Sequence, residues 1–330
     1  MIRKSTIESF FEEGNPFTDL LPYFSYENGF FVLNDGSLGQ VWQLTLIESE
    51  TKSTLYLEEL SRMIEGILIR LPEEKVSCQF ILFSDTDFDE KFDEYMSFSC
   101  PSGNNVVSAC VKSRLEHLKK GRDGFFDTHT GLFSAKRIRV FFTMRYFSPY
   151  LEASAKDKVR FYFTPKNLIR EKAADSFAMN FQSISRFSEI VEGVFRSCEI
   201  KFSKVDEEGL FKILYKVFNP GRAKALPVPV FRPDEPMIDQ ILYNYPNVRG
   251  EGFEFEGELY RVVSLKELPL STETGMFSAE LTKGTRFSIL DLIKDFTMVI
   301  NFYIPNQEKA VSGIKMHKAF AFMQIGRAHV

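Results

Sequence analysis

Apolar and polar residues near the start of the chain follow the pattern of a β-hairpin. In "FVLNDGSLGQVWQL" (31–44), Phe31 and Leu33 fall on one face of a strand, "NDGS" turns the chain, and "LGQVWQL" returns. Asp35-Gly36 suits a type I′ turn, because glycine tolerates a positive φ and aspartate does so better than most residues. We expect Trp42, the only tryptophan, to be buried on the second strand.

Apolar residues spaced by three and four predict the helices. The clearest series runs through Phe177, Phe181, Ile184, Phe187 and Val191 and indicates a long helix over about 166–197. Pro72 is expected to end an earlier helix, and Asp206 to cap a later one. The other predicted helices lie over 60–71, through Leu115 to Gly121, over 210–217 and over 306–324.

Short β-branched and aromatic runs predict the strands. A hairpin is expected over 252–265 with its turn at Gly257, and 297–305 is predicted to be a central strand. The acidic run "DTDFDEKFDEY" (85–95) is interpreted as a solvated loop or helix face. The remaining predicted strands and loops are strands over 76–83 and 137–147, and loops over 99–105 and 269–276 before a segment around 286–295.

The order of these elements predicts an α+β fold of layered helices and hairpins rather than a strict β-α-β wind. Five prolines fall within 220–236, and proline-rich stretches behave as stiff spacers. We therefore predict two mixed subdomains joined by a Pro-rich linker. The expected boundaries are an N-terminal subdomain over 1–219, a linker over 220–236 and a second α+β segment over 237–324.

Composition restricts the class of protein. The chain has 330 residues, 44% of them hydrophobic, 35 phenylalanines and a formal net charge of −4, which predicts a real core and argues against wholesale coating of nucleic acid. No apolar run approaches the roughly 20 residues that span a bilayer, and the first residues lack a signal-peptide pattern. These two features favour a cytoplasmic protein, and its four cysteines are dispersed and expected to be reduced thiols (Cys78, Cys100, Cys110 and Cys198).

Known catalytic patterns find little support. Neither Gly275, followed by "MFSAEL", nor Gly284, followed by "TRFSIL", begins the GxxxxGK[ST] pattern that holds phosphates. His129 with Asp127 could supply metal ligands, although an ordinary loop is the favoured interpretation. Cys78 lies in a predicted buried strand, where an inert thiol is expected. The histidines are far apart in sequence, at His117, His129, His317 and His329.

One basic stretch remains a candidate interaction surface. Residues 136–172 hold ten Lys or Arg against three acids, with aromatic residues interleaved. Such a stretch can hold phosphate backbones, anionic lipid headgroups or an acidic partner. The alternative interpretation is a solvated helix face with outward strand positions. The candidate residues are Arg137, Arg139, Arg145, Lys156, Lys158 and Arg160.

Three segments carry a resemblance to a known family. The hairpin "FVLNDGSLGQVWQL" resembles the N-terminal region of the conjugation ATPases of type IV secretion systems, in the TraC branch of the VirB/TraC family. "ELYRVVSLKELP" (258–269) and "VINFYIPNQEKA" (299–310) resemble later segments of that region, in the same order. Such ATPases continue into a RecA-like motor, whose P-loop, Walker B carboxylate and arginine finger match no position here.

The resemblance implies a non-catalytic docking and oligomerisation region. Its implied partners are inner-membrane and cytoplasmic components of the secretion system, at the cytoplasmic face of the inner membrane, and other copies of itself. The full-length parent is expected to be a hexamer. No cofactor is expected in this chain, whereas ATP and Mg²⁺ belong to the motor. "IGRAHV" (325–330) resembles a translated sequencing adapter, so we expect a truncated reading frame and a non-native tail. The alternative is a self-contained protein that binds nucleic acid or an anionic surface through 136–172.

Overall fold

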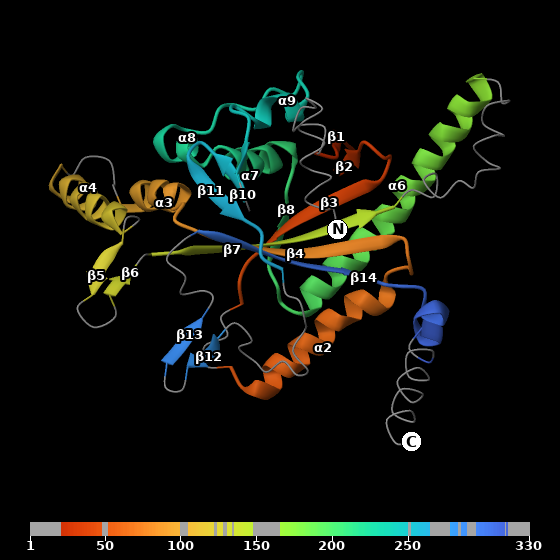
Figure 1. The fold of residues 1–330 in the computed structure, drawn as a ribbon, viewed down its shortest axis with the longest axis horizontal. Helices are drawn as coiled ribbons and strands as arrows, with labels where there is room; N and C mark the ends of the chain where they lie inside the picture. Colours follow the sequence, from red (N-terminus) through yellow and green to blue (C-terminus); the bar gives the residue numbers. More distant parts are fainter. Residues whose placement is uncertain are drawn as a thin grey trace.

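The centre of the molecule is an antiparallel sheet of seven strands in the order β1-β2-β3-β7-β4-β14, with β8 paired to β3 (Figure 1). In this computed structural model the described residues are 21–47, 52–99, 105–121, 124–127, 131–133, 135–147, 166–249, 252–264, 278–282, 285–288, 295–313 and 315. The strands are β1 (Tyr23–Glu27), β2 (Phe30–Leu33), β3 (Leu38–Leu44), β4 (Val76–Asp85), β7 (Arg137–Tyr146), β8 (Phe202–Lys204) and β14 (Phe296–Tyr303). Helices accompany this antiparallel sheet, so the predicted α+β class is confirmed.

The opening hairpin forms as predicted, but its turn differs. The Gly36 amide donates to the Leu33 carbonyl and the Leu33 amide donates to the Ser37 carbonyl, at 2.8 and 2.9 Å. This is a three-residue loop in which Gly36 alone has a positive φ, so the predicted type I′ turn at Asp35-Gly36 is wrong. The carboxylate of Asp35 accepts from the Ser37 amide, a local bond that favours an ordinary turn conformation at Asp35.

A further strand, β1, precedes this hairpin and was not predicted. It joins β2 through Asn28 and Gly29, whose φ values of 53° and 87° are those of a type I′ turn. Asn-Gly between apolar strands is the strongest short-range signal for such a turn, so the sequence at Asn28-Gly29 predicts it.

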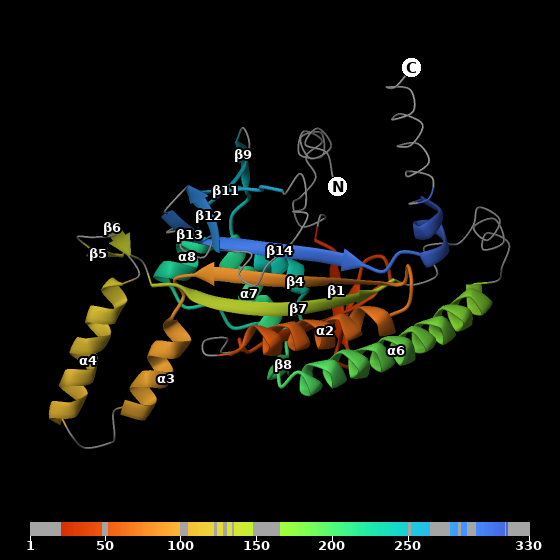
Figure 2. The same cartoon turned by 90° about the horizontal axis from the view of Figure 1, so that it is seen from below.

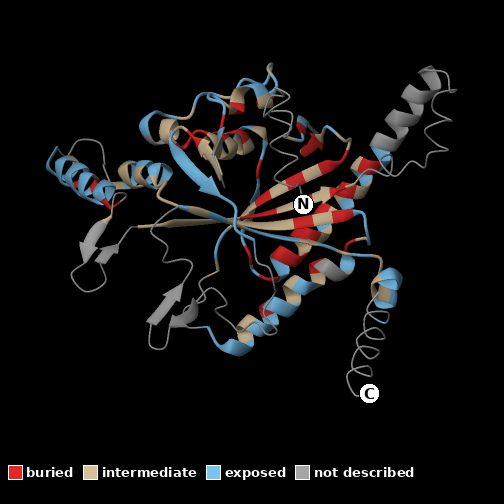
Figure 3. Ribbon diagram, in the orientation of Figure 1, coloured by how far each residue is buried: buried red, intermediate tan, exposed pale blue. Residues whose placement is uncertain are grey.

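Two long helices cover one face of the sheet (Figure 2). α2 (Thr54–Arg70) begins at Ser53, whose hydroxyl accepts from the Tyr56 amide, and it ends two residues before Pro72. α6 (Lys166–Ser197) has the bounds predicted from its apolar spacing. Together with the sheet they enclose the larger core, whose buried residues are among those drawn in red in Figure 3. Its most buried side chains include Leu38, Trp42, Ile67, Phe142, Met144, Ile184, Val191 and Phe195.

A second, smaller core lies on the opposite face. Phe30 and Val32 of β2 belong to the larger core while Phe31 belongs to the smaller one, because alternate strand residues point to opposite faces. α7 (Glu207–Phe218), capped by Asp206, and α9 (Met237–Ile241) supply most of its other members. These are Phe211, Tyr215, Met237 and Ile241, together with Tyr23 of β1.

The proline-rich residues 220–236 are packed and partly helical. They begin with α8 (Pro220–Ala225), and Val228 and Phe231 then pack against the smaller core, with the Phe231 ring 5.4 Å from that of Phe211. β14, from the predicted second segment, joins the sheet that begins at β1. The division of the chain at 220–236 stays a prediction, and these contacts connect its two sides.

β14 pairs with β4 over all eight of its residues, from Phe296 opposite Ser84 to Tyr303 opposite Ser77. It is the last strand of the sheet, so the prediction of a central strand is wrong. The mostly apolar sequence of β14 resembles a strand buried on both faces, yet five of its eight residues are exposed.

Two helices form an arm between β4 and β7. α3 (Asp89–Ser99), predicted only as a solvated acidic segment, and α4 (Asn105–Lys120) project from the sheet side by side (Figure 2). α3 has no buried residue, whereas α4 buries Val111 and Leu115. The strands β5 (Phe125–Asp127) and β6 (Gly131–Phe133) follow the arm.

The predicted hairpin with its turn at Gly257 is confirmed. Glu256 and Gly257 have φ values of 50° and 87°, so this turn is of type I′. The small sheet is β9 (Asn247–Arg249), β10 (Gly252–Phe255) and β11 (Glu258–Arg261), and β12 (Ser278–Thr282) pairs separately with β13 (Thr285–Ser288). The predicted loop over 269–276 and the tail over 325–330 lie outside the described residues. Within the described residues no helix has the length and apolarity to cross a bilayer.

Candidate functional site

Three arginines of the predicted basic surface lie on β7. Arg137, Arg139 and Arg145 occupy odd-numbered positions of this strand, so they share one face of the sheet. Each forms an ion pair with a carboxylate from another element. This face therefore carries alternating charges that compensate each other.

Arg137 binds the first turn of α3, and Arg139 binds the end of β4. Arg137 donates to Glu90 of α3 at 2.8 Å and to the Asp87 carbonyl at 3.2 Å, while Arg139 pairs with Asp85. The hydrogen bond from Arg137 is the main reason that the pKa of Glu90 lies below its usual value. The guanidinium of Arg139 also lies over the Phe83 ring, 5.7 Å from its centroid.

Asp87 extends this cluster to α7. Its carboxylate accepts a hydrogen bond from Lys216, near the end of that helix. Burial alone would raise the pKa of Asp87, but the hydrogen bond and charge of Lys216, with Arg139 nearby, hold it below its ordinary value. The arm is thus tied to the sheet and to α7 by ionised groups.

Arg145 stabilises the opening hairpin. It pairs with Asp35 and donates to the Ser37 hydroxyl at 2.9 Å, and its guanidinium lies 4.8 Å from the centre of the Phe147 ring. Burial favours a higher pKa for Asp35, but the hydrogen bonds from Ser37 and the charge of Arg145 outweigh it, and the pKa is lowered.

The structure therefore gives internal partners to Arg137, Arg139 and Arg145. Lys156 and Lys158 lie outside the described residues, as does Arg160, so their role in an anion-binding surface stays a prediction. The sequence pattern of 85–95 predicts a solvated acidic segment, so it does not indicate these ion pairs. Their signal was complementary charge at the ends of two strands, where Asp85 and Arg137 prove to be opposite in register.

The thiols differ in accessibility. Cys78 and Cys198 are buried while Cys110 is exposed, and Cys100 lies outside the described residues. Burial raises the pKa of Cys78 to about 12, so its thiol stays protonated near neutral pH. The predicted inert character of Cys78 follows from this environment.

In the part of the chain that the structure describes, His, Cys, Asp and Glu form no group of three or more that could hold a metal. His117 lies in the last turn of α4. His129, the candidate ligand beside Asp127, lies outside the described residues, as do His317 and His329.

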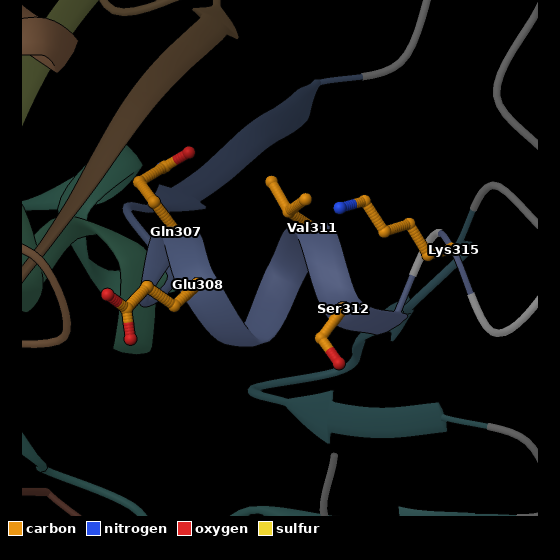
Figure 4. A pocket seen from close by; sticks show the side chains of 5 residues that line it. All are labelled: Gln307, Glu308, Val311, Ser312 and Lys315. Carbon is orange, nitrogen blue, oxygen red and sulfur yellow. The ribbon is translucent and has the colours of Figure 1, made fainter.

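A surface hollow of about 450 Å³ borders the helical segment that follows β14 (Figure 4). Its lining comes from this one segment and includes a single carboxylate, Glu308, and a single ammonium group, Lys315. Catalysis generally requires a nucleophile or acid positioned by a second group, and these side chains do not provide such an arrangement.

Exposed apolar side chains are the more prominent feature of the surface. Phe98 and Val106, at the facing ends of α3 and α4, are 82% and 73% exposed. β14 exposes Val299, Ile300 and Tyr303. Exposed apolar side chains that gather on one element are typical of interaction surfaces.

Comparison with known proteins identifies the family of the chain. Residues 17–324 match the family described as TraC protein. A 125-residue segment, 37% of the chain, is 29% identical to the "Conjugal transfer protein TrbE" of Rhizobium radiobacter. That segment covers 14% of the length of the TrbE protein. The chain belongs to the TraC protein family of conjugative type IV secretion systems.

Proposed function

We propose that this chain is the docking and oligomerisation region of a conjugal transfer ATPase. The observation that supports docking most directly is the arm, which projects apolar side chains away from a well-packed body. Phe98 and Val106 lie at its end, Arg137 pairs with Glu90 in the first turn of α3, and Arg139 pairs with Asp85 at the end of β4. A projecting arm with an apolar end is suited to insertion into a pocket of a partner protein.

The partners we propose are components of the secretion system at the cytoplasmic face of the inner membrane. The conjugal transfer character of the family supports this assignment. ATP hydrolysis is assigned to a motor region outside these residues, since the sequence contains no GxxxxGK[ST] element to hold phosphates. The 330-residue chain accordingly needs neither ATP nor Mg²⁺ to dock.

The experiment measures co-sedimentation of the purified chain with inverted inner-membrane vesicles, whose cytoplasmic face is outward. Vesicles are prepared from cells with and without the matching conjugation system. We expect retention only on vesicles that carry the system, and loss of retention in a Phe98→Asp/Val106→Asp variant. Val230→Asp is the control, because Val230 is 87% exposed but lies outside the arm.

Equal retention on both vesicle preparations, or none on either, contradicts the docking proposal.

A second candidate function, binding to anionic surfaces or nucleic acid through 136–172, rests on the excess of basic residues there. It predicts retention on any anionic vesicle, with a steep decrease as the salt concentration rises.

A further inference from the structure

We infer that β14 is a self-association surface, at which the β14 strands of two copies pair antiparallel about a two-fold axis and join their sheets. The inference specifies the oligomerisation part of the proposed function and rests on it. Four observations support it: the open edge of the strand, its lack of charge, its exposed apolar side chains and its self-complementary order of residues.

The outer edge of β14 is open. All eight residues pair with β4, and among the described strands none pairs with the opposite side of β14. An edge strand presents unpaired N–H and C=O groups, which bind another strand unless something prevents it. Figure 2 shows β14 beside β4, at the end of this sheet.

The sequence of β14 lacks the usual protection. "FTMVINFY" contains no charged residue, proline or glycine. The opposite edge of the sheet is different: β1 has five residues, an irregular register between Tyr23 and Ser25, a charged end at Glu27 and contacts with α9. Short strands, bulges, charges and covering elements are the means by which proteins block edge pairing. Within the described residues, the edge at β1 has these features, whereas the edge at β14 has none of them.

β14 packs against the larger core through Phe302, and it also exposes apolar side chains. The Phe302 ring lies 5.9 Å from that of Phe80 and 6.2 Å from that of Phe142, within the larger core. Val299 and Ile300 are 46% and 42% exposed, and Tyr303 is 66% exposed. A rigid strand with uncovered apolar side chains loses little conformational entropy when it binds.

The order of residues suits pairing with a second copy. Antiparallel pairing about a two-fold axis normal to the sheet keeps side chains of one face together, and it can centre on Ile300. Met298 then lies opposite the partner's Phe302, and Thr297 opposite the partner's Tyr303. Asp295, the charged residue next to the strand, falls opposite the partner's Pro305 and meets no like charge. Centring on Val299 would instead place Asp295 opposite the partner's Tyr303.

The first test is the mass of the 330-residue chain in solution, measured by light scattering after size exclusion over a range of concentrations. We expect a dimer that dissociates on dilution. Ile300→Lys should give a monomer, since the centred register places two like charges together. Phe24→Lys is the matched control: it adds the same charge at a 67% exposed position on the blocked edge, β1, and should leave the dimer intact.

Cysteine cross-linking tests the register. In a background with Cys100→Ser and Cys110→Ser, we expect Ile300→Cys to form a disulfide-linked dimer when copper phenanthroline is the oxidant. Thr297→Cys should not, because its partner across the axis is Tyr303. A monomeric parent chain, a dimer that survives Ile300→Lys in a folded protein, or equal cross-linking of both cysteine variants overturns the inference.

The outcome is separable from that of the docking proposal. Far-UV circular dichroism and the thermal midpoint establish that Ile300→Lys is folded. If this monomeric variant still binds vesicles carrying the secretion system, the two surfaces are independent. If the parent chain dimerises but binds no such vesicle, docking fails while the β14 inference stands.

Discussion

At the scale of single residues, Glu192 is the polar centre of the larger core. Its carboxylate accepts from the Trp42 indole at 3.4 Å and from the Ser188 hydroxyl at 3.1 Å, and it pairs with Lys204 at 2.8 Å. It also pairs with Arg196 one helical turn later. One buried side chain of α6 thus connects β3, β8 and its own helix, and it gives the buried indole N–H of Trp42 a hydrogen-bond partner.

The charge of Glu192 predicts a pH dependence of stability. Burial favours a higher pKa for Glu192. The hydrogen bond and charge of Lys204 and the hydrogen bonds from Ser188 and Trp42 outweigh burial, so the pKa lies below its usual value of 4.5. A carboxyl whose pKa is lowered by folding stabilises the protein above its unfolded pKa, and this contribution is lost as the pH falls through the folded pKa. Glu192→Gln should therefore reduce stability at pH 7, by about 1–3 kcal/mol, and much less at pH 3.

Urea unfolding followed by Trp42 fluorescence measures this difference. Glu189→Gln, on the exposed side of the same helix, is the control and should change stability little at either pH. An equal loss at pH 7 and pH 3 for Glu192→Gln would show that packing rather than charge is responsible.

At the scale of elements, two glycines have opposite roles. Gly252 begins β10, where an added Cβ would lie 2.3 Å from the Tyr260 carbonyl oxygen of β11. Gly66 lies within α2, where an added Cβ meets nothing within 4 Å. The first is needed for the close approach of two strands, whereas the second only adds conformational freedom to a helix.

Substitution by alanine should separate these roles. Gly252→Ala should destabilise the β9–β11 sheet by about 1–3 kcal/mol, because the backbone of Tyr260 cannot move without losing its pairing. Gly66→Ala should stabilise the protein by about 0.5–1 kcal/mol. Thermal midpoints report both effects, and hydrogen exchange of the β10 and β11 amides locates the first; unchanged exchange there would contradict the steric argument.

At the scale of the whole molecule, distant segments share one core. Phe302 of β14 contacts Phe142 of β7, and the Phe142 ring lies 5.7 Å from that of Trp42 of β3. The chain must bring residue 302 beside a core that begins near residue 30. Pairing between such distant strands carries a large loop-closure cost, which burial of the aromatic rings offsets.

Phe302→Ala tests whether the two ends of the chain unfold together. The ring is partly buried, so we expect a loss of about 2–3 kcal/mol, less than for a fully buried phenylalanine. The loss should be visible in the unfolding midpoint of Trp42, although the two residues are far apart in sequence. Tyr245→Ala, at a 76% exposed ring, is the control and should leave the midpoint unchanged. An unchanged Trp42 midpoint for Phe302→Ala would mean that β14 and β3 unfold independently.

Local chemistry by itself determined most of the elements. The periodicity of 166–197 predicted the bounds of α6, Asp206 predicted the start of α7, and the turn at Gly257 was confirmed. Each of these depends on residues within a few positions of one another, and such short-range preferences can be read directly from the sequence.

Only the tertiary structure decided what these elements contact. It paired the arginines of β7 with Asp35, Asp85 and Glu90, placed β14 at the edge and packed the proline-rich segment against the smaller core. A mostly apolar strand has the same sequence pattern in the centre of a sheet and at its edge. A basic stretch has the same sequence pattern whether or not carboxylates face it. The neighbours across the sheet settle both questions, and they come from residues far away along the chain.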